Sequence, residues 1–296
     1  MNEIPVSSLA SSPPGLARRI LRSPPLRILV LGFILVLMMT LTTDILTTFS
    51  PDPGKSDLHI IALAIAAFAI YLTYAHSVEQ REATELSSKG MPRELGLGLL
   101  VGAGLYTGSV LVLMAMGVYK INGLNSWTLL LPAVSMAISS GVFEELLFRG
   151  VLFRSLETWF GTWVGLVVSS FVFGLTHLIN PEATLEGALF IAVEAGILLA
   201  AAYILTRRLW LSIGFHMAWN YTQSAIFSGI VSGNEAAPGL IQSTVKGPDI
   251  LTGGKFGVES SIVALILCTS TGIALVILAL KRGQFIPPIW KRQRTV

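Results

Sequence analysis

The feature that most constrains this chain is a series of apolar segments, each about as long as a membrane-crossing helix. An α-helix needs about 20 predominantly apolar residues to cross the hydrocarbon core of a bilayer. None of the segments alternates apolar and polar residues as the strands of a membrane barrel do. Because lipid offers the backbone no hydrogen bonds, we predict that all of them are helices. Eight segments meet the length requirement: Leu26–Phe49, Leu58–His76, Leu95–Val118, Trp127–Phe148, Gly161–Ile179, Leu185–Leu205, Leu209–Val231 and Ser260–Leu280.

The composition excludes the other broad classes of protein. Hydrophobic residues make up 53% of the 296 residues and charged residues only 12%, whereas a soluble domain carries about 25% charged residues. A disordered chain combines few apolar residues with a high net charge, and the net charge here is +3. The prediction is therefore an all-α, polytopic membrane protein of eight transmembrane helices. It places an N-terminal tail at 1–25, the transmembrane domain at 26–281 and a basic tail at 282–296.

The distribution of Lys and Arg predicts the orientation. Cytoplasmic segments of membrane proteins are enriched in these residues. If the chain starts in the cytoplasm and crosses eight times, sixteen of its 20 basic residues lie inside and four lie outside, namely Lys55, Lys120, Lys246 and Lys255. We therefore predict that both termini are cytoplasmic. The longest connection, 232–259, is then external, and a plain linker is favoured over a lid for it.

The first group of polar residues inside an apolar segment is Glu144-Glu145-x-x-x-Arg149. Ionisable groups in a membrane span are costly, so by default they indicate a functional site. Arg149 follows Glu145 by four residues, which places both on one helical face in the favourable acid-then-base order. Glu144 lies about 100° away around the same helix. Its carboxylate is thereby left available as a general base or acid.

The other polar groups lie on two further segments. His177 ends Phe173-x-x-x-His177, and His216 and Asn220 are four residues apart, so they share a helical face. A lone histidine in a membrane is more often a helix–helix hydrogen-bond partner than a catalyst. Two histidines, a carboxylate pair and an arginine on three segments favour a site, because buried polar groups must satisfy one another. Glu194 could line the same cavity, although a structural hydrogen bond is the favoured interpretation.

These three motifs, in this order over about residues 125–231, resemble the CAAX protease and bacteriocin-processing (CPBP, or Abi) family. That family includes the Ras-converting prenyl endopeptidases. The resemblance implies eight helices that enclose an intramembrane catalytic cavity, and a peptidase acting on a membrane-associated substrate. Whether the substrate is C-terminally prenylated stays open. The expected location is a bacterial cell membrane, with lipid and a peptide substrate as partners and no nucleic acid.

The resemblance also implies roles for the residues of the motifs. Glu144 and His177 would activate a water molecule, and His216 and Asn220 would form the oxyanion hole. Glu145 and Arg149 would be the supporting ion pair. Preorganised donors of the oxyanion-hole kind are worth about 10²–10³ in rate.

Whether a metal takes part is a separate question, because the family is often classed among the metalloendopeptidases. Glu144, His177 and His216 could hold a catalytic zinc ion with water in the fourth position. The chain lacks the His-Glu-x-x-His spacing that places two zinc ligands and a base on one helix. The glutamate mechanism needs no metal and is the favoured alternative.

Two non-enzymatic functions compete with this interpretation. A catalytically inactive relative of the same fold could regulate a membrane partner or confer immunity to a bacteriocin, but the complete motifs favour an enzyme. A small-solute transporter is disfavoured because the sequence shows no internal repeat.

One geometric difficulty follows from the predicted segments. Counting at 1.5 Å per residue puts Glu144 near the inner end of the fourth segment and His177 near the outer end of the fifth, too far apart to share a water. Either the fourth helix continues through Arg154 or the fifth ends within the membrane beside a cavity.

Overall fold

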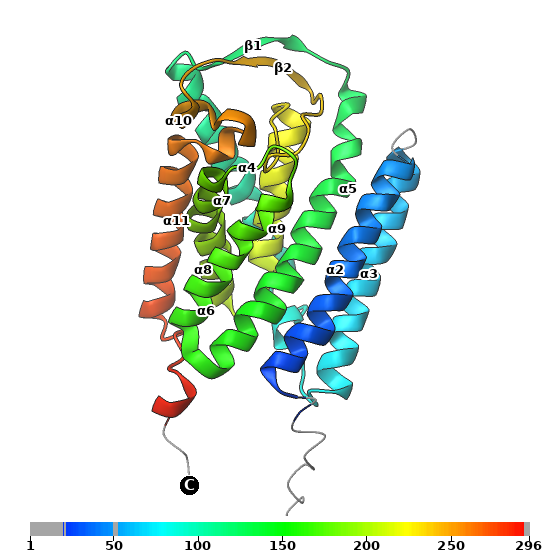
Figure 1. Cartoon of the computed structure of the whole chain (residues 1–296), viewed down its shortest axis with the longest axis vertical. Helices are drawn as coiled ribbons and strands as arrows, with labels where there is room; N and C mark the ends of the chain where they lie inside the picture. Colours follow the sequence, from blue (N-terminus) through cyan, green and yellow to red (C-terminus); the bar gives the residue numbers. More distant parts are fainter. Residues whose placement is uncertain (1–19, 21, 50–52, 293–296) are drawn as a thin grey trace, which may run out of the picture.

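The chain folds into a bundle of helices that run roughly parallel to one long axis (Figure 1). The computed structural model describes residues 20, 22–49 and 53–292. The predicted N-terminal tail therefore lies almost entirely outside the described residues, as do the last four residues of the basic tail. The helices are α2 (Pro24–Phe49), α3 (Pro53–Ser77), α4 (Met91–Ala115), α5 (Pro132–Ser139), α6 (Arg154–Thr176), α7 (Leu185–Ile191), α8 (Ile197–Thr206), α9 (Trp210–Tyr221), α10 (Asp249–Thr252) and α11 (Ile262–Lys281).

Several of these helices are joined by π-helical stretches rather than by loops. Residues 140–144 and 146–153 carry the chain from α5 into α6, residues 192–196 join α7 to α8, and residues 222–226 extend α9. A π turn is wider than an α turn and occurs frequently at functional sites. The long apolar segments therefore contain local departures from regular α geometry.

The all-α membrane class is correct, but the number of spans differs from the prediction. In the described part of the chain, six helical stretches are long and apolar enough to cross a membrane, not eight. The predicted fourth and fifth segments belong to one helical stretch, Trp127–Ile179, which has 53 residues. The predicted seventh segment contains α9, which has only 12 residues before its π-helical extension.

The 53-residue stretch reverses its direction at Gly161. This residue has φ of +80°, in the left-handed region that other residues avoid. A Cβ at Gly161 would lie 2.8 Å from the carbonyl oxygen of Ile286. A glycine is therefore required at this reversal both by its backbone conformation and by its close packing.

The connection 232–259 is structured rather than a plain linker. Its strand β2 (Ile241–Val245) pairs with β1 (Tyr119–Leu124) in an antiparallel sheet with a register shift between Ile121 and Gly123. Figure 1 shows this sheet and α10 at the end of the bundle opposite the C-terminus. Phe256 in the same connection is fully buried. The connection therefore covers one end of the bundle.

Helices α4 and α9 approach each other at glycines. A Cβ at Gly98 would lie 2.3 Å from the carbonyl oxygen of Leu211, and one at Gly102 would lie 2.3 Å from that of Phe215. Gly98 and Gly102 thus permit the close packing of the two helices. This crossing determines the position of α9, the helix that carries His216 and Asn220.

Candidate active site

The helical path between α5 and α6 resolves the difficulty over Glu144 and His177. The fourth predicted segment continues as helix through Arg154 and reverses only at Gly161. Glu144 is therefore in the interior of a long helical stretch, and His177 immediately follows α6. Both side chains line one cavity of about 560 Å³.

An ion pair between Glu145 and Arg149 lies at the centre of the site. The Arg149 guanidinium donates from Nη1 to Glu145 Oε1 at 2.8 Å and from Nη2 to the carbonyl oxygen of Gly196 at 3.1 Å. The guanidinium also lies 4.6 Å from the centroid of the Phe173 ring. The two charged side chains are only 1% and 0% exposed. A charge buried this deeply must be paired, so the pair predicted from the spacing is present.

Glu145 also connects this pair to His216. Nδ1 of His216 lies 3.0 Å from the same Oε1 atom that accepts from Arg149. Because a carboxylate can only accept, His216 carries a proton on Nδ1. This contact leaves Nε2 of His216 directed away from Glu145, at 4.0 Å from Glu144 Oε2.

One oxygen atom of the Glu144 carboxylate is buried, while the side chain as a whole is 16% exposed. Its Oε2 atom has no hydrogen-bond partner among the described residues. Most buried polar atoms have such a partner, so an exception calls for an explanation. Glu144 lines the 560 Å³ cavity, which Asn220 also lines. A carboxylate oxygen directed at a cavity and free of protein donors can accept a proton from a bound molecule.

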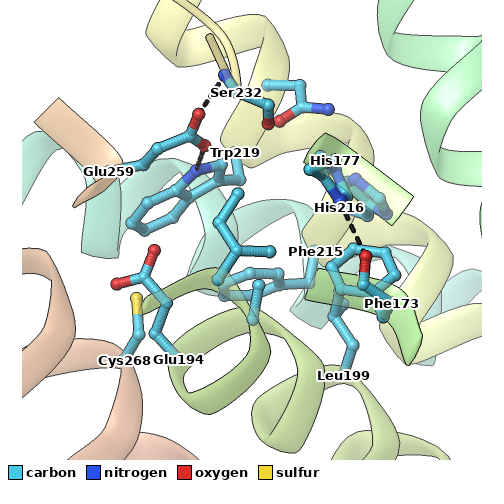
Figure 2. A pocket seen from close by; sticks show the side chains of 13 residues that line it. Phe173, His177, Glu194, Leu199, Phe215, His216, Trp219, Ser232, Glu259 and Cys268 are labelled. Atoms are coloured by element: carbon cyan, nitrogen blue, oxygen red, sulfur yellow. Dashed lines mark hydrogen bonds between the residues drawn. The ribbon is translucent and has the colours of Figure 1, made fainter. Parts of the chain in front are cut away.

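His177 is oriented by the backbone of its own helix. Its Nδ1 atom lies 2.8 Å from the carbonyl oxygen of Phe173 (Figure 2). A carbonyl only accepts, so the hydrogen-bond network assigns the proton to Nδ1. In the neutral ring, Nε2 then carries a lone pair.

Asn220 is held by a residue that the sequence motifs do not include. Its Nδ2 group donates to the hydroxyl of Ser140 at 2.8 Å. Ser140 lies in the π-helical stretch 140–144 that also carries Glu144. The amide of Asn220 therefore has a fixed orientation at the cavity wall.

Behind the histidines lies a second, smaller cavity of about 20 Å³ (Figure 2). This volume accommodates about one water molecule. Glu194 lines it, and Glu194 Oε2 has no hydrogen-bond partner in the described part of the chain. Of the two roles considered for Glu194, the structure supports a position in the wall of a cavity.

Glu259 approaches this smaller cavity from the connection 232–259. Its carboxylate accepts from the backbone N–H of Ser232 and from Nε1 of Trp219, the latter at 3.4 Å (Figure 2). Burial raises the pKa of Glu259 from 4.5 to about 7, although hydrogen bonds from Ser232 and Trp219 act in the opposite direction. The connection thus supplies a buried titratable group beside the site.

The residues proposed as zinc ligands do not form a metal site as they are placed. Among the described residues, no three His, Cys, Asp or Glu side chains are grouped so that they could hold a metal ion. Nδ1 of each histidine is engaged, so only Nε2 atoms could act as ligands. We therefore derive no catalytic step through a metal.

The structure brings together all six residues that the motifs predicted, and adds three others. The two cavities are lined by Glu144, His177, His216 and Asn220. The ion pair of Glu145 and Arg149 is buried next to them. Ser140, Ser232 and Glu259 were not predicted. Ser140 lies four residues before Glu144, a helical spacing that could have indicated its position, whereas Ser232 and Glu259 reach the site through tertiary folding that no local pattern encodes.

Comparison with known proteins identifies the domain that contains these motifs. The family model described as "Type II CAAX prenyl endopeptidase Rce1-like" matches residues 126–222. This match supports the assignment of the chain to the CAAX protease family. A search of curated proteins and a search of solved structures each found no match.

The family match supports a CAAX protease-type enzyme. Together with the apolar helices, it supports an integral multi-pass membrane protein. A membrane protease implies the lipid bilayer and a peptide substrate as partners. The matched residues include Glu144, Glu145, Arg149, His177, His216 and Asn220.

Proposed function

We propose that this CAAX protease relative is an intramembrane endopeptidase that hydrolyses a peptide bond with a water molecule activated by Glu144 and His177. One observation carries the proposal: Glu144 has a buried, unpaired carboxylate oxygen in a cavity that His177 and Asn220 also line. Hydrolysis of an amide needs a base for water and donors for the developing oxyanion. The side chains around this cavity supply both.

Water activation is assigned to Glu144, with His177 as its partner. A water molecule in the larger cavity would donate one hydrogen bond to Glu144 Oε2 and the other to His177 Nε2. Glu144 then takes a proton as the water oxygen attacks the carbonyl carbon, and the same carboxylic acid protonates the leaving amine. The backbone bond of His177 to Phe173 favours this role because it keeps the lone pair on Nε2.

The oxyanion hole is assigned to His216 and Asn220. To donate from Nε2, His216 must be protonated on both nitrogens. The carboxylates of Glu145 at 3.0 Å and Glu144 at 4.0 Å favour this cationic form. With His216 cationic, two carboxylates face two cations, His216 and Arg149, so the buried cluster is neutral as a whole.

Glu145 and Arg149 act as positioning residues in this proposal. Glu145 holds both Arg149 and His216 through one oxygen atom. Arg149 prevents Glu145 from carrying an uncompensated buried charge. The pair therefore supports the orientation of His216 without contacting the substrate.

The topology that goes with this function is also a proposal. The stretch Trp127–Ile179 would cross the membrane twice because it reverses at Gly161, and α9 with residues 222–226 would cross once. Together with the other five spans this gives eight crossings, with both termini in the cytoplasm. The basic asymmetry of the sequence supports that orientation.

Substrate trapping tests the proposed function. The Glu144→Gln variant keeps the shape of the side chain but removes the base, so we expect it to retain bound peptides that wild-type protein cleaves. Mass spectrometry of co-purified peptides, compared between the two proteins, would identify them. Equal peptide capture by both proteins, together with equal turnover, would contradict the assignment of Glu144.

A further inference from the structure

The cavity that Glu144 lines continues towards one end of the bundle, and this direction bears on how a substrate reaches the site. The 560 Å³ cavity extends from Glu144 to Asp44, Asn180 and Asn234. A neighbouring cavity of about 390 Å³ shares Ser139, Ser140 and Asn234 with it and continues to Glu235 and Pro238. Together these two cavities form a groove that leads from Glu144 to the connection 232–259.

The groove opens at the end of the bundle away from the cytoplasmic tails. Its outer wall is formed by the end of α2, the residues after α6 and the residues before β2. Figure 1 shows the connection 232–259 at the end of the bundle opposite the C-terminal end of α11. By the distribution of Lys and Arg, the end that holds the termini is cytoplasmic.

The path from the site to the cytoplasmic end is filled by packed side chains. Val151 and Phe153 lie on the helical stretch between Glu144 and Arg154, and both are completely buried. Beyond them, Arg154 pairs with Glu79 at 2.9 Å and with Glu85 at 2.7 Å. A substrate therefore cannot reach Glu144 from the cytoplasm without separation of this core and its ion pairs.

The groove wall is mainly apolar but carries polar side chains that can bind a peptide backbone. Hydroxyl and amide side chains line it along its length, from three elements of the bundle. Peptide groups taken out of water need hydrogen-bond partners, and these side chains can provide them. The polar lining residues are Thr40, Thr42, Thr43, Ser139, Ser140, Asn180, Ser224, Ser232 and Asn234.

We infer that the substrate is an extended peptide segment that reaches the site from the external face of the membrane. This inference rests on the proposed function, because it concerns access to the same catalytic groups. It assigns cleavage to exported or externally exposed segments of membrane-associated proteins. The cleavage of a prenylated cytoplasmic C-terminus is the competing outcome.

Sealed membrane vesicles of opposite orientation test the inference. The probe is a membrane-impermeant pool of internally quenched peptides of mixed sequence, added to vesicles that contain the full chain or its Glu144→Gln variant. We expect Glu144-dependent cleavage in right-side-out vesicles, and in inside-out vesicles only after permeabilisation with detergent. The reverse pattern would overturn the inference and leave the peptidase function intact. Permeabilised vesicles that show no Glu144-dependent cleavage in either preparation would contradict the proposed function itself.

Cysteine labelling tests the orientation without relying on activity. Glu235→Cys introduces a thiol at the groove mouth, and Ser88→Cys introduces one at the opposite end, both at exposed positions. Cys268 is buried, and the unmodified chain measures its background. An impermeant maleimide added to intact spheroplasts should label only the Glu235→Cys variant. Labelling of only the Ser88→Cys variant would overturn the inference.

Discussion

The amide of Asn220 donates a hydrogen bond to the hydroxyl of Ser140 at 2.8 Å and thereby links α9 to the helical stretch that carries Glu144. This contact fixes one proposed oxyanion donor relative to the proposed base. A catalytic constellation depends on such support, because a misplacement of about 1 Å can cost about 10²-fold in rate.

Ser140 therefore offers a test of positioning at the oxyanion hole. We expect Asn220→Ala to lower kcat by about 10²-fold, since it removes a donor. Ser140→Ala should lower kcat by about 10-fold and leave KM and the melting temperature nearly unchanged, because Asn220 would remain but lose its orientation. Ser140→Thr, which keeps a hydroxyl, should recover part of the loss. Steady-state kinetics on the quenched peptide pool measure all three variants, and wild-type kcat in Ser140→Ala would contradict the positioning role.

The close approach of α4 and α9 gives a matched pair of glycine variants. At Gly102, a Cβ would lie 2.3 Å from the Phe215 carbonyl, whereas a Cβ at Gly104 meets nothing within 4 Å. Gly102→Ala should displace α9 and lower both the melting temperature and kcat. Gly104→Ala should be neutral or stabilise the fold by about 0.5–1 kcal/mol, because alanine is the better helix former. Thermal unfolding of both variants in detergent checks this, and equal effects would contradict the described packing.

The buried ion pair predicts strong thermodynamic coupling. Removal of one partner of such a pair costs about 3–5 kcal/mol. Arg149→Ala and Glu145→Ala should each lower the free energy of unfolding by about this amount, and the double variant should be less damaged than the sum of the two. Glu145→Ala should be the more harmful of the two, because Glu145 also holds His216.

The exposed pair of Glu182 and Lys255 is the control for this cycle. Its atoms lie 3.0 Å apart, but the side chains are 47% and 78% exposed. A surface pair contributes about 0–1 kcal/mol. Denaturant unfolding of the two cycles in detergent should give a large coupling energy for the first pair and a small one for the second. Additive losses at Glu145 and Arg149 would contradict the assignment of the buried pair.

Glu259 predicts a pH dependence of stability. Burial raises the pKa of Glu259 to about 7 in the folded protein, against 4.5 as its ordinary value. Between these two pH values the carboxyl group of Glu259 is ionised in the unfolded chain but still protonated in the folded protein. The contribution of Glu259 to stability therefore falls by about 3 kcal/mol as the pH rises from 4.5 to 7, and is constant above that range.

The Glu259→Gln variant removes this titration while it keeps a hydrogen-bond acceptor. Relative to this variant, wild-type protein should lose stability between pH 4.5 and 7. Glu235→Gln, at an exposed position in the same connection, should leave the wild-type pH profile unchanged. Thermal unfolding across this pH range measures the difference, and parallel profiles for wild type and Glu259→Gln would show that Glu259 does not titrate as described.

The sequence predicted the membrane class and the grouping of the six motif residues because both depend on local patterns. Apolar length identified the helices, and the four-residue spacing of Glu145 and Arg149 identified their ion pair. The helical conformation of residues 154–160 was not predicted, because this polar, aromatic stretch resembles a loop in the sequence. Arg149, which the orientation count placed in a cytoplasmic segment, is instead buried in the bundle.

The residues that the sequence missed reach the site through tertiary contacts. Glu259 precedes α11 by three residues and resembles an ordinary helix-flanking acid, yet it contacts Trp219 of α9. Ser232 contributes a backbone N–H, a group that every residue except proline possesses. Periodicity cannot identify either contact, since both depend on how the connection 232–259 folds onto the bundle.

The most direct test of the account is the turnover of the Glu144→Gln variant, measured together with its melting temperature. Glu144 accepts no hydrogen bond from a cation in the described part of the chain, and His216 keeps its closer contact with Glu145 at 3.0 Å. Neutralising Glu144 should therefore leave the melting temperature within about 2 °C of wild type. The account predicts that cleavage of the peptide pool falls by at least about 10³-fold in the same preparation. Wild-type turnover in a folded Glu144→Gln protein would contradict the central claim.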